Sequence, residues 1–232
     1  MAKSQNRFLS SLSQADLGLL TPHLRTVQLS RGKLIFEQGH EIERVYFPLD
    51  GGVSFLVVMT DGEQVEAGMI GSDGVVGSSA ALSGAKAINT AIVQVALSAS
   101  VIDANQMRAA AAASHALRTK LYQHDQLLLA QAQQSAACNA LHHVEERLCR
   151  WLLRTRDLVE SNVLETTQEF LSQMLGVRRT SVTLTARRLQ SLGLIKYRRA
   201  RIEIVDPDGL KESSCECYES FRTQQQRLLE SD

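Results

Sequence analysis

The sequence predicts an α+β protein in which an antiparallel roll of short strands, a long helical stretch and a helix-turn-helix follow one another. Three observations lead to this prediction. Hydrophobic residues alternate from Val27 to about Leu97, residues 104–158 contain neither glycine nor proline, and residues 167–205 combine helical periodicity with a glycine turn and a hairpin pattern. A period of two is typical of half-buried strands, and spacings of three and four are typical of helices.

Length and composition indicate an ordinary globular protein. The chain has 232 residues, enough for two domains that each bury a core, and it is 44% hydrophobic and 22% charged. Its N-terminus lacks an uninterrupted apolar run, and no window approaches 18 apolar residues. We therefore expect a cytoplasmic protein without a membrane segment.

The N-terminal half has the rhythm of a small antiparallel roll or barrel. Residues 8–20 are expected to form one leading helix, with Ser13 and Asp16 as a capping pair. Beyond Val27, turn residues recur about every ten positions, at Asp50-Gly-Gly, Asp61-Gly62 and Ser72-Asp-Gly74.

The glycine-free stretch should form three helices, divided near Ser114 and near residues 139–142. The middle helix carries a stripe at three-four spacing that ends at Cys138, and from the residues alone this stripe is equally a dimer surface or a face lying on the roll. In the third helix, Glu145, Glu146, Arg147 and Arg150 are expected to be solvated, and Leu148, Trp151, Leu152 and Leu158 to fill the core. We call the following residues of the middle helix the inner stripe: Leu117, Leu121, His124, Leu128, Gln131 and Ser135.

The stretch from Thr167 to Val205 has a one-sided charge, although the chain's net charge is zero. No acidic residue lies between Glu169 and Glu203, whereas eight basic residues do: Arg178, Arg179, Arg187, Arg188, Lys196, Arg198, Arg199 and Arg201. Such a local concentration of cations is typical of a surface that binds nucleic acid.

Helical spacing within this stretch predicts a helix, a turn at Gly176 and a second helix whose inward residues are Val182, Ala186, Leu189 and Leu192. Arg179, at the start of the second helix, has the fork of donors that fits guanine O6 and N7. Thr180 and Leu184 are expected near thymine methyl groups. The positions expected to contact phosphates include Arg178, Ser181, Thr183 and Arg187, and the complete predicted DNA-binding set adds Thr167 and Arg199.

The same segments resemble the Crp/Fnr transcriptional regulators. The resemblance rests on Gly176-Val-Arg-Arg-Thr-Ser-Val and Leu189-Gln-Ser-Leu-Gly-Leu-Ile-Lys-Tyr, and on Leu29-Ser-Arg-Gly-Lys-Leu-Ile-Phe-Glu-Gln-Gly with Tyr46-Phe-Pro and Gly52-Val-Ser-Phe-Leu. It covers nearly the whole chain. It implies an N-terminal β-roll of the cyclic-nucleotide-binding type (a jelly roll), a long connecting dimerisation helix and a C-terminal winged helix-turn-helix.

The resemblance also implies the domain plan and the partners. The expected domains are a sensor domain at 1–113, a dimerisation helix at 114–141, a DNA-binding domain at 142–215 and a helical tail at 216–232. The chain would form a homodimer through the inner stripe. The homodimer would bind a palindromic operator in double-stranded DNA through the recognition helix at 178–192 of each copy. RNA polymerase and an unidentified small-molecule effector are further expected partners.

Cyclic AMP is not expected as that effector. In cyclic-nucleotide-binding members of the family, a Gly-Glu pair holds the ribose and an Arg-Ser pair holds the phosphate, whereas this chain has Gly77-Ser78 and Asn89-Thr90 at the matching positions. A buried phosphate needs a cation or a cluster of amide donors, yet Lys86 is the only basic residue between Arg44 and Arg108. These four residues, with Lys86, mark the predicted effector pocket.

No cofactor or metal is expected. No cysteine precedes Cys138 to bind an iron–sulfur cluster, and no histidine lies between His40 and His115 to hold a haem in the roll. Cys215-Glu-Cys217 has the wrong spacing for a zinc knuckle, so the four cysteines are expected as free thiols, and His142-His143 as polar surface.

The sequence bears on two other classes of function. An enzyme is not expected, because the Gly-Ser sequences lack the Gly-x-Ser-x-Gly spacing and no motif ties a histidine to a nucleophile. The other class is a small-molecule sensor or adaptor that does not bind DNA, in which the basic helix is only a solvated surface.

Overall fold

The computed structural model describes residues 6–84 and 86–230. The chain divides into two compact units, which we treat separately. The first unit is built mainly from residues before Leu56 and from Gly68–Ala130, and the second from Val57–Ala67 and Gln131–Gln224.

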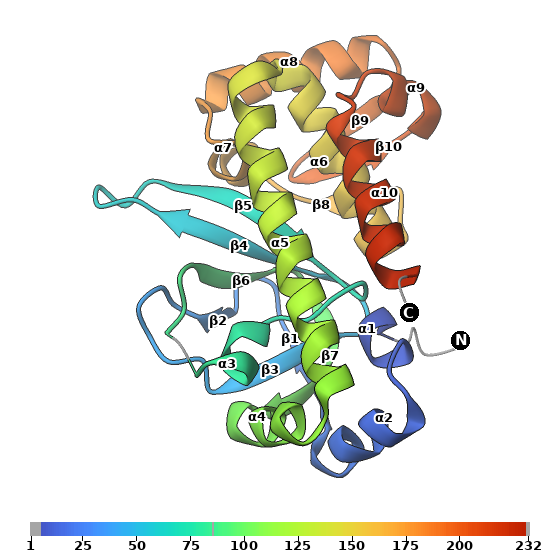
Figure 1. Cartoon of the computed structure of the whole chain (residues 1–232). Helices are drawn as coiled ribbons and strands as arrows, with labels where there is room; N and C mark the ends of the chain where they lie inside the picture. Colours follow the sequence, from blue (N-terminus) through green and yellow to red (C-terminus); the bar gives the residue numbers. More distant parts are fainter. Residues whose placement is uncertain (1–5, 85, 231–232) are drawn as a thin grey trace. The chain divides into compact units, whose positions relative to one another are not determined.

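Most of the first unit is a roll of two antiparallel sheets flanked by short helices (Figure 1), and the adjoining ends of its strands β4 and β5, within Val57–Ala67, group with the second unit. One sheet has the order β1-β7-β3 and the other the order β2-β6-β4-β5. The strands are β1 (Arg25–Leu29), β2 (Leu34–Phe36), β3 (Arg44–Pro48), β4 (Gly52–Val58), β5 (Gln64–Ile70), β6 (Thr90–Val95) and β7 (Leu97–Asp103). The helices of this part are α1 (Arg7–Ser10), α2 (Gln14–Leu20), the 3-10 turn η1 (Thr21–His23), α3 (Ser78–Leu82) and α4 (Ala104–Ala113).

The expected single leading helix is wrong, because the structure has two short helices, α1 and α2. Ser13 is the reason for the new start: its hydroxyl accepts a hydrogen bond from the Asp16 amide (3.1 Å) and donates one to the Asp16 carboxylate (2.8 Å). A serine that satisfies a free amide in this way begins a helix rather than continuing one.

The helical stretch contains three helices, as predicted. They are α4, α5 (His115–Leu141) and α6 (Val144–Val159). Ser114 divides the first two, and its hydroxyl accepts a hydrogen bond from the Leu117 amide at the start of α5 (3.1 Å). His143 begins α6, where the Glu146 carboxylate accepts a hydrogen bond from the His143 amide (2.8 Å).

The second unit contains α6, a three-stranded sheet and the predicted pair of helices. The sheet has the order β8-β10-β9, formed by β8 (Val163–Glu165), β9 (Ile195–Arg198) and β10 (Arg201–Ile204). The further helices are α7 (Gln168–Leu175), α8 (Arg179–Ser191), α9 (Pro207–Glu212) and α10 (Cys217–Glu230). Gly176 ends α7 in the left-handed conformation (φ 60°), which confirms the predicted glycine turn.

The core of the second unit confirms most of the predicted inward residues and corrects two. Leu148, Trp151, Leu152 and Leu158 are buried, and so are Val182, Ala186 and Leu189. Leu192 is exposed, because α8 ends one residue earlier, at Ser191. Arg147 is buried rather than solvated, since its guanidinium donates a hydrogen bond to the Leu175 carbonyl at the end of α7.

Candidate nucleic-acid interface

The outward face of α8 is polar, basic and exposed. Val182, Ala186 and Leu189 turn inward, and this leaves Arg178, Arg179, Thr180, Leu184 and Arg187 on the surface. Leu184 is 67% exposed, so its apolar side chain is accessible to a molecule that contacts this face. The helix therefore presents an arginine in its first turn and another in its third, with one apolar side chain between them.

Contacts with α7 orient the start of α8. The Thr183 hydroxyl donates a hydrogen bond to the Gln168 side chain (2.8 Å), and Arg179 lies 3.8 Å from the Glu169 carboxylate. Both side chains of the Arg179–Glu169 pair are largely exposed, so the pair contributes little stability and leaves the guanidinium available. Thr167 begins α7, and its hydroxyl accepts a hydrogen bond from the Phe170 amide (3.1 Å).

The hairpin formed by β9 and β10 extends the basic surface. Arg199 and Ala200 form its two-residue turn, with φ values of 40° and 65°. Positive φ at both central residues is the geometry that matches the twist of the flanking strands. Arg199 is exposed at the tip of the hairpin. Arg198 and Arg201 lie opposite each other on the two strands, at the base of the turn.

The predicted effector residues are placed by α3 and β6 of the first unit. Gly77 precedes α3 and Ser78 begins it, with the Ser78 hydroxyl donating a hydrogen bond to the Asp125 carboxylate of α5 (2.5 Å). Thr90 begins β6, and its hydroxyl accepts a hydrogen bond from the Gln38 amide (3.2 Å). Asn89 is half-buried and Lys86 is exposed. A carboxylate beside Ser78 opposes the approach of a phosphate at this position.

The inner stripe of α5 is not available to a partner subunit. Leu117 and Leu121 have no exposed surface and pack in a hydrophobic cluster with Phe8, Phe47 and Met107. Leu128 packs against a separate hydrophobic cluster inside the roll. His124, Gln131 and Ser135 are buried as well, and His124 accepts a hydrogen bond from the Val75 amide (2.9 Å). Five of the six inner-stripe residues are buried and Leu128 is half-buried, so the structure leaves little of the predicted dimer surface exposed to a partner subunit.

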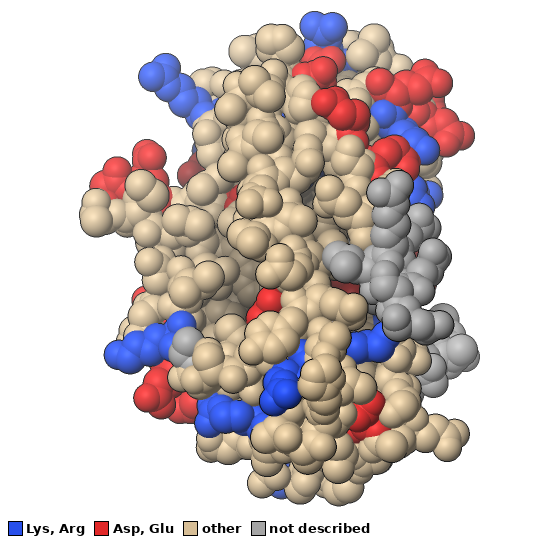
Figure 2. All heavy atoms as spheres, in the orientation of Figure 1, with Lys and Arg blue, Asp and Glu red and all other residues tan. Residues whose placement is uncertain are grey.

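The opposite face of α5 is exposed and almost uncharged. The sequence has no Asp, Glu, Lys or Arg from Gln126 to Val144, and Figure 2 shows few charged side chains over the C-terminal part of this helix. Tyr122 and Leu129 are 54% and 51% exposed. Six exposed residues recur at alternating intervals of four and three, and we call them the outer stripe: Tyr122, Gln126, Leu129, Gln133, Ala136 and Ala140.

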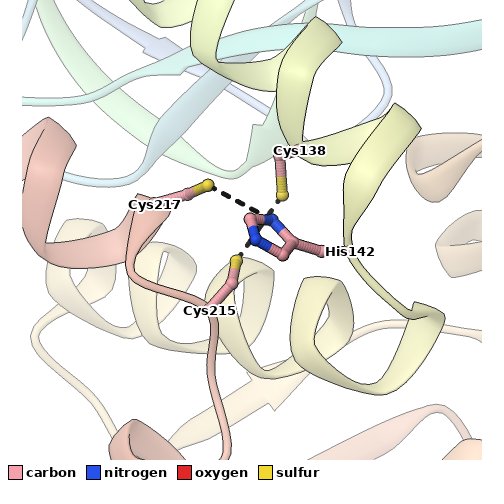
Figure 3. A group of neighbouring side chains, drawn as sticks. All are labelled: Cys138, His142, Cys215 and Cys217. Atoms are coloured by element: carbon pink, nitrogen blue, oxygen red, sulfur yellow. Dashed lines mark hydrogen bonds between the residues drawn. The ribbon is translucent and has the colours of Figure 1, made fainter.

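A group of four side chains in the second unit was not predicted from the sequence. Cys138, His142, Cys215 and Cys217 point toward one another (Figure 3), and one ligand atom from each lies within 4.8 Å of the others. Only the spacing of Cys138 and His142 along one helix and the Cys-x-Cys sequence could have indicated it. More than 70 residues separate these two halves, so their proximity was not visible in the sequence.

A helix-turn-helix followed by a β-hairpin, joined by a long helix to an antiparallel roll, defines a winged-helix DNA-binding protein with an attached sensor-type domain. The comparisons with known families agree. Residues 26–114 match the cyclic nucleotide-binding domain, and residues 146–213 match the Crp-like helix-turn-helix domain. The chain has the fold of the Crp/Fnr transcriptional regulators, which are DNA-binding proteins and not enzymes.

Solved structures with this fold cover most of the chain. One is a putative Crp/Fnr-family regulator from Eubacterium rectale, with a TM-score of 0.71 at 16% identity, covering 90% of this chain and 96% of that one. FixK2 from Bradyrhizobium japonicum gives a TM-score of 0.70 at 17% identity, with coverage of 83% and 98%. The Crp/Fnr-family regulator TTHA1359 from Thermus thermophilus gives a TM-score of 0.66 at 23% identity, covering 84% of this chain and 98% of that one. A search of curated protein sequences finds no significant match.

No helix among the described residues is both long and apolar enough to cross a membrane.

Proposed function

We propose that the protein regulates transcription by binding an inverted-repeat operator as a homodimer, with α8 in the major groove, and that cyclic AMP does not control it. The observation that carries this proposal is the outward face of α8, where Arg179 and Leu184 are exposed beside a hairpin tipped by Arg199. A basic helix backed by a buried apolar stripe and flanked by a basic hairpin presents one continuous surface to the DNA backbone.

Within this surface, different residues have different roles. Arg179 is the base-reading residue, and Thr180 and Leu184 lie near thymine methyl groups. Arg178, Ser181, Thr183, Arg187 and Arg199 contact phosphates, where a charge or hydroxyl fixes the position of the protein without reading sequence. Thr167, at the N-terminus of α7, adds a phosphate contact through the free amides of that helix end.

The outer stripe of α5 forms the dimer surface. Its alternating spacing of four and three is that of a coiled-coil core, and an exposed stripe with Tyr122 and Leu129, on a helix that has no charged residue from Gln126 onward, gains stability when it is covered. A two-fold axis along this stripe presents two copies of α8 to successive major grooves. The half-sites are then about 34 Å apart, or roughly one helical turn.

The remaining assignments follow the domain plan. The sensor domain at 1–113 holds an unidentified small-molecule effector near Gly77, Ser78, Lys86, Asn89 and Thr90. Residues 114–141 form the dimerisation helix, 142–215 the DNA-binding domain and 216–232 a helical tail, of which 231–232 lie outside the described residues. RNA polymerase is the partner through which a bound dimer changes transcription.

DNA binding itself is tested by measuring retention of mixed-sequence duplex DNA at increasing salt. Phosphate contacts release counterions, so the logarithm of the binding constant should fall linearly with the logarithm of salt concentration. A genomic footprint of the purified protein, with and without cell extract, then identifies the operator. Absence of salt-dependent retention would favour the alternative, a sensor or adaptor that does not bind DNA.

Replacing Arg179 with alanine is expected to weaken binding to the preferred operator by about 1–3 kcal/mol, and binding to random DNA much less, because a bidentate contact to guanine is lost. Competition titrations with operator and random duplexes measure both values. Arg187→Ala is the matched control, since loss of a phosphate contact weakens binding to the two duplexes equally. An equal loss for Arg179→Ala would make Arg179 a phosphate contact too.

Neither cyclic AMP nor cyclic GMP is expected to bind tightly or to change DNA affinity. Ser78 and Asn89 replace the family's carboxylate and arginine, and the Ser78 hydroxyl is already bonded to Asp125. Isothermal titration calorimetry with each nucleotide measures this, and DNA retention by the same preparation shows that the protein is active. Micromolar binding of either nucleotide would contradict the prediction and would point to Lys86 or backbone amides as the phosphate ligands.

A further inference from the structure

The four side chains of the cysteine–histidine cluster, Cys138, His142, Cys215 and Cys217, converge from two segments of the second unit (Figure 3). Cys138 lies in the last turn of α5, and His142 directly follows that helix, one turn further along. Cys215 and Cys217 lie at the start of α10, on either side of Glu216. All three cysteines are buried and form a separate cluster of their own.

We propose that this cluster binds one zinc ion as a Cys3His site. Three thiolates and an imidazole are the ligands that Zn²⁺ takes in closed tetrahedral sites, whereas Mg²⁺ and Ca²⁺ prefer oxygen ligands. These four residues are not among the DNA-binding or effector residues, and the site does not depend on the function proposed above.

The distances fit a single tetrahedral ion. Zinc bonds of about 2.3 Å to sulfur and about 2.0–2.1 Å to nitrogen place two ligand sulfurs about 3.8 Å apart, and a sulfur and a nitrogen about 3.6 Å apart. In the structure, the Cys138 and Cys215 sulfurs are 3.5 Å apart, and the Cys217 sulfur is 3.5 Å from His142 Nδ1. In an iron–sulfur cube each ligand binds a different iron, and this holds the ligand atoms farther apart.

The surroundings of the cluster support a bound cation. His142 Nδ1 faces the sulfurs, while its other nitrogen, Nε2, lies 3.3 Å from the Glu216 carboxylate. A carboxylate behind a ligating histidine fixes the ring orientation and makes the ligand more basic. The Gln134 side-chain amide donates a hydrogen bond to the Cys217 sulfur (3.0 Å), which favours the thiolate form that a metal requires.

Two arginines offset the negative charge of the site. A zinc ion with three thiolates and a neutral imidazole has a net charge of minus one, and Arg150 and Arg147 of α6 both interact electrostatically with Cys138. The zinc ion would fasten the start of α10 to the end of α5.

Elemental analysis of the full-length protein, purified under reducing conditions from cells supplied with zinc, tests this proposal. We expect one zinc per chain in the wild type and none in Cys138→Ser or Cys215→Ser. Two matched controls should keep their zinc: Cys149→Ala, which changes a buried cysteine outside the cluster, and His143→Ala, which changes the exposed neighbour of His142.

Titration of the metal-free wild-type protein with cobalt(II) gives a second measurement that does not depend on the folding of any variant. We expect the intense visible absorption bands of tetrahedral cobalt(II) together with thiolate-to-cobalt charge-transfer absorption. Both should disappear when added zinc displaces the cobalt. Limited proteolysis should show faster cleavage between residues 213 and 230 after metal removal.

Four outcomes would overturn the proposal. The first is a wild-type protein that retains no zinc and gives no tetrahedral cobalt spectrum, and the second is zinc retained in both cysteine variants. The third is a wild-type protein that contains iron with acid-labile sulfide. The fourth is a Cys138–Cys215 disulfide in metal-free protein isolated without oxygen.

Discussion

Replacing Tyr122 and Leu129 together with glutamate is expected to give a soluble monomer that has lost specific DNA binding. Both side chains are about half exposed and lie on the outer stripe, so the substitutions should not disturb the chain's own core. In a dimer they would place like charges across the interface. A single copy of α8 makes too few contacts for specificity, so the specific advantage over random DNA, about 10³-fold or more, should disappear.

Sedimentation velocity measures the oligomeric state of this double variant, and footprinting measures protection of the palindrome. Ile88→Glu is the control, because it adds the same charge at a hydrophobic residue that is 87% exposed and lies outside α5. A double variant that still sediments as a dimer and protects a full inverted repeat would show that the partner surface lies elsewhere.

Glutamate at the neighbouring inner-stripe position should have a different effect. Leu121 has no exposed surface, so Leu121→Glu buries a charge in the cluster with Phe8 and Phe47 and should unfold the first unit rather than release a monomer. The contrast between adjacent residues of one helix therefore distinguishes a dimer surface from a core surface.

Replacing Arg147 with alanine is expected to lower the free energy of unfolding of the second unit by about 2–4 kcal/mol. The substitution leaves the Leu175 carbonyl at the end of α7 without its buried donor, and it also removes the packing of the arginine stem. Urea unfolding followed by the fluorescence of Trp151 measures the effect, since Trp151 is the only tryptophan of the chain and is buried in α6.

Arg187→Ala serves as the control for that experiment. Arg187 is exposed on α8, and surface substitutions of this kind usually change stability by no more than about 0.5 kcal/mol. Equal and small effects of the two substitutions would mean that water replaces the Arg147 donor at the Leu175 carbonyl.

Local features of the fold could be predicted from the sequence because neighbouring residues cause them. Gly176 ends α7 since glycine accepts a left-handed backbone, and Ser114 separates α4 from α5 through a hydrogen bond to an amide three residues away. The buried stripe of α8 follows from helical spacing alone. The fold class and the basic face of α8 needed no long-range information.

The tertiary structure decided what each predicted face touches. The periodicity of α5 indicates which side chains share a face, but the same inner stripe could have covered the roll or a second subunit, and packing with Phe8 and Phe47 selects the roll. Arg147 is buried for a similar reason, because the carbonyl that accepts its hydrogen bond belongs to residue 175, on another helix.

The cysteine–histidine cluster is the clearest example of a feature that only the tertiary structure determined. The sequence shows Cys138 and His142 at helical spacing and Cys215-Glu-Cys217 far from them, and neither half is by itself a metal site. The path of the chain through α6, the sheet and α9 brings Cys138 and Cys215 within 3.5 Å across 77 residues. Proximity over such a separation results from the packing of the whole unit, whereas helix ends and charged faces result from residues a few positions apart.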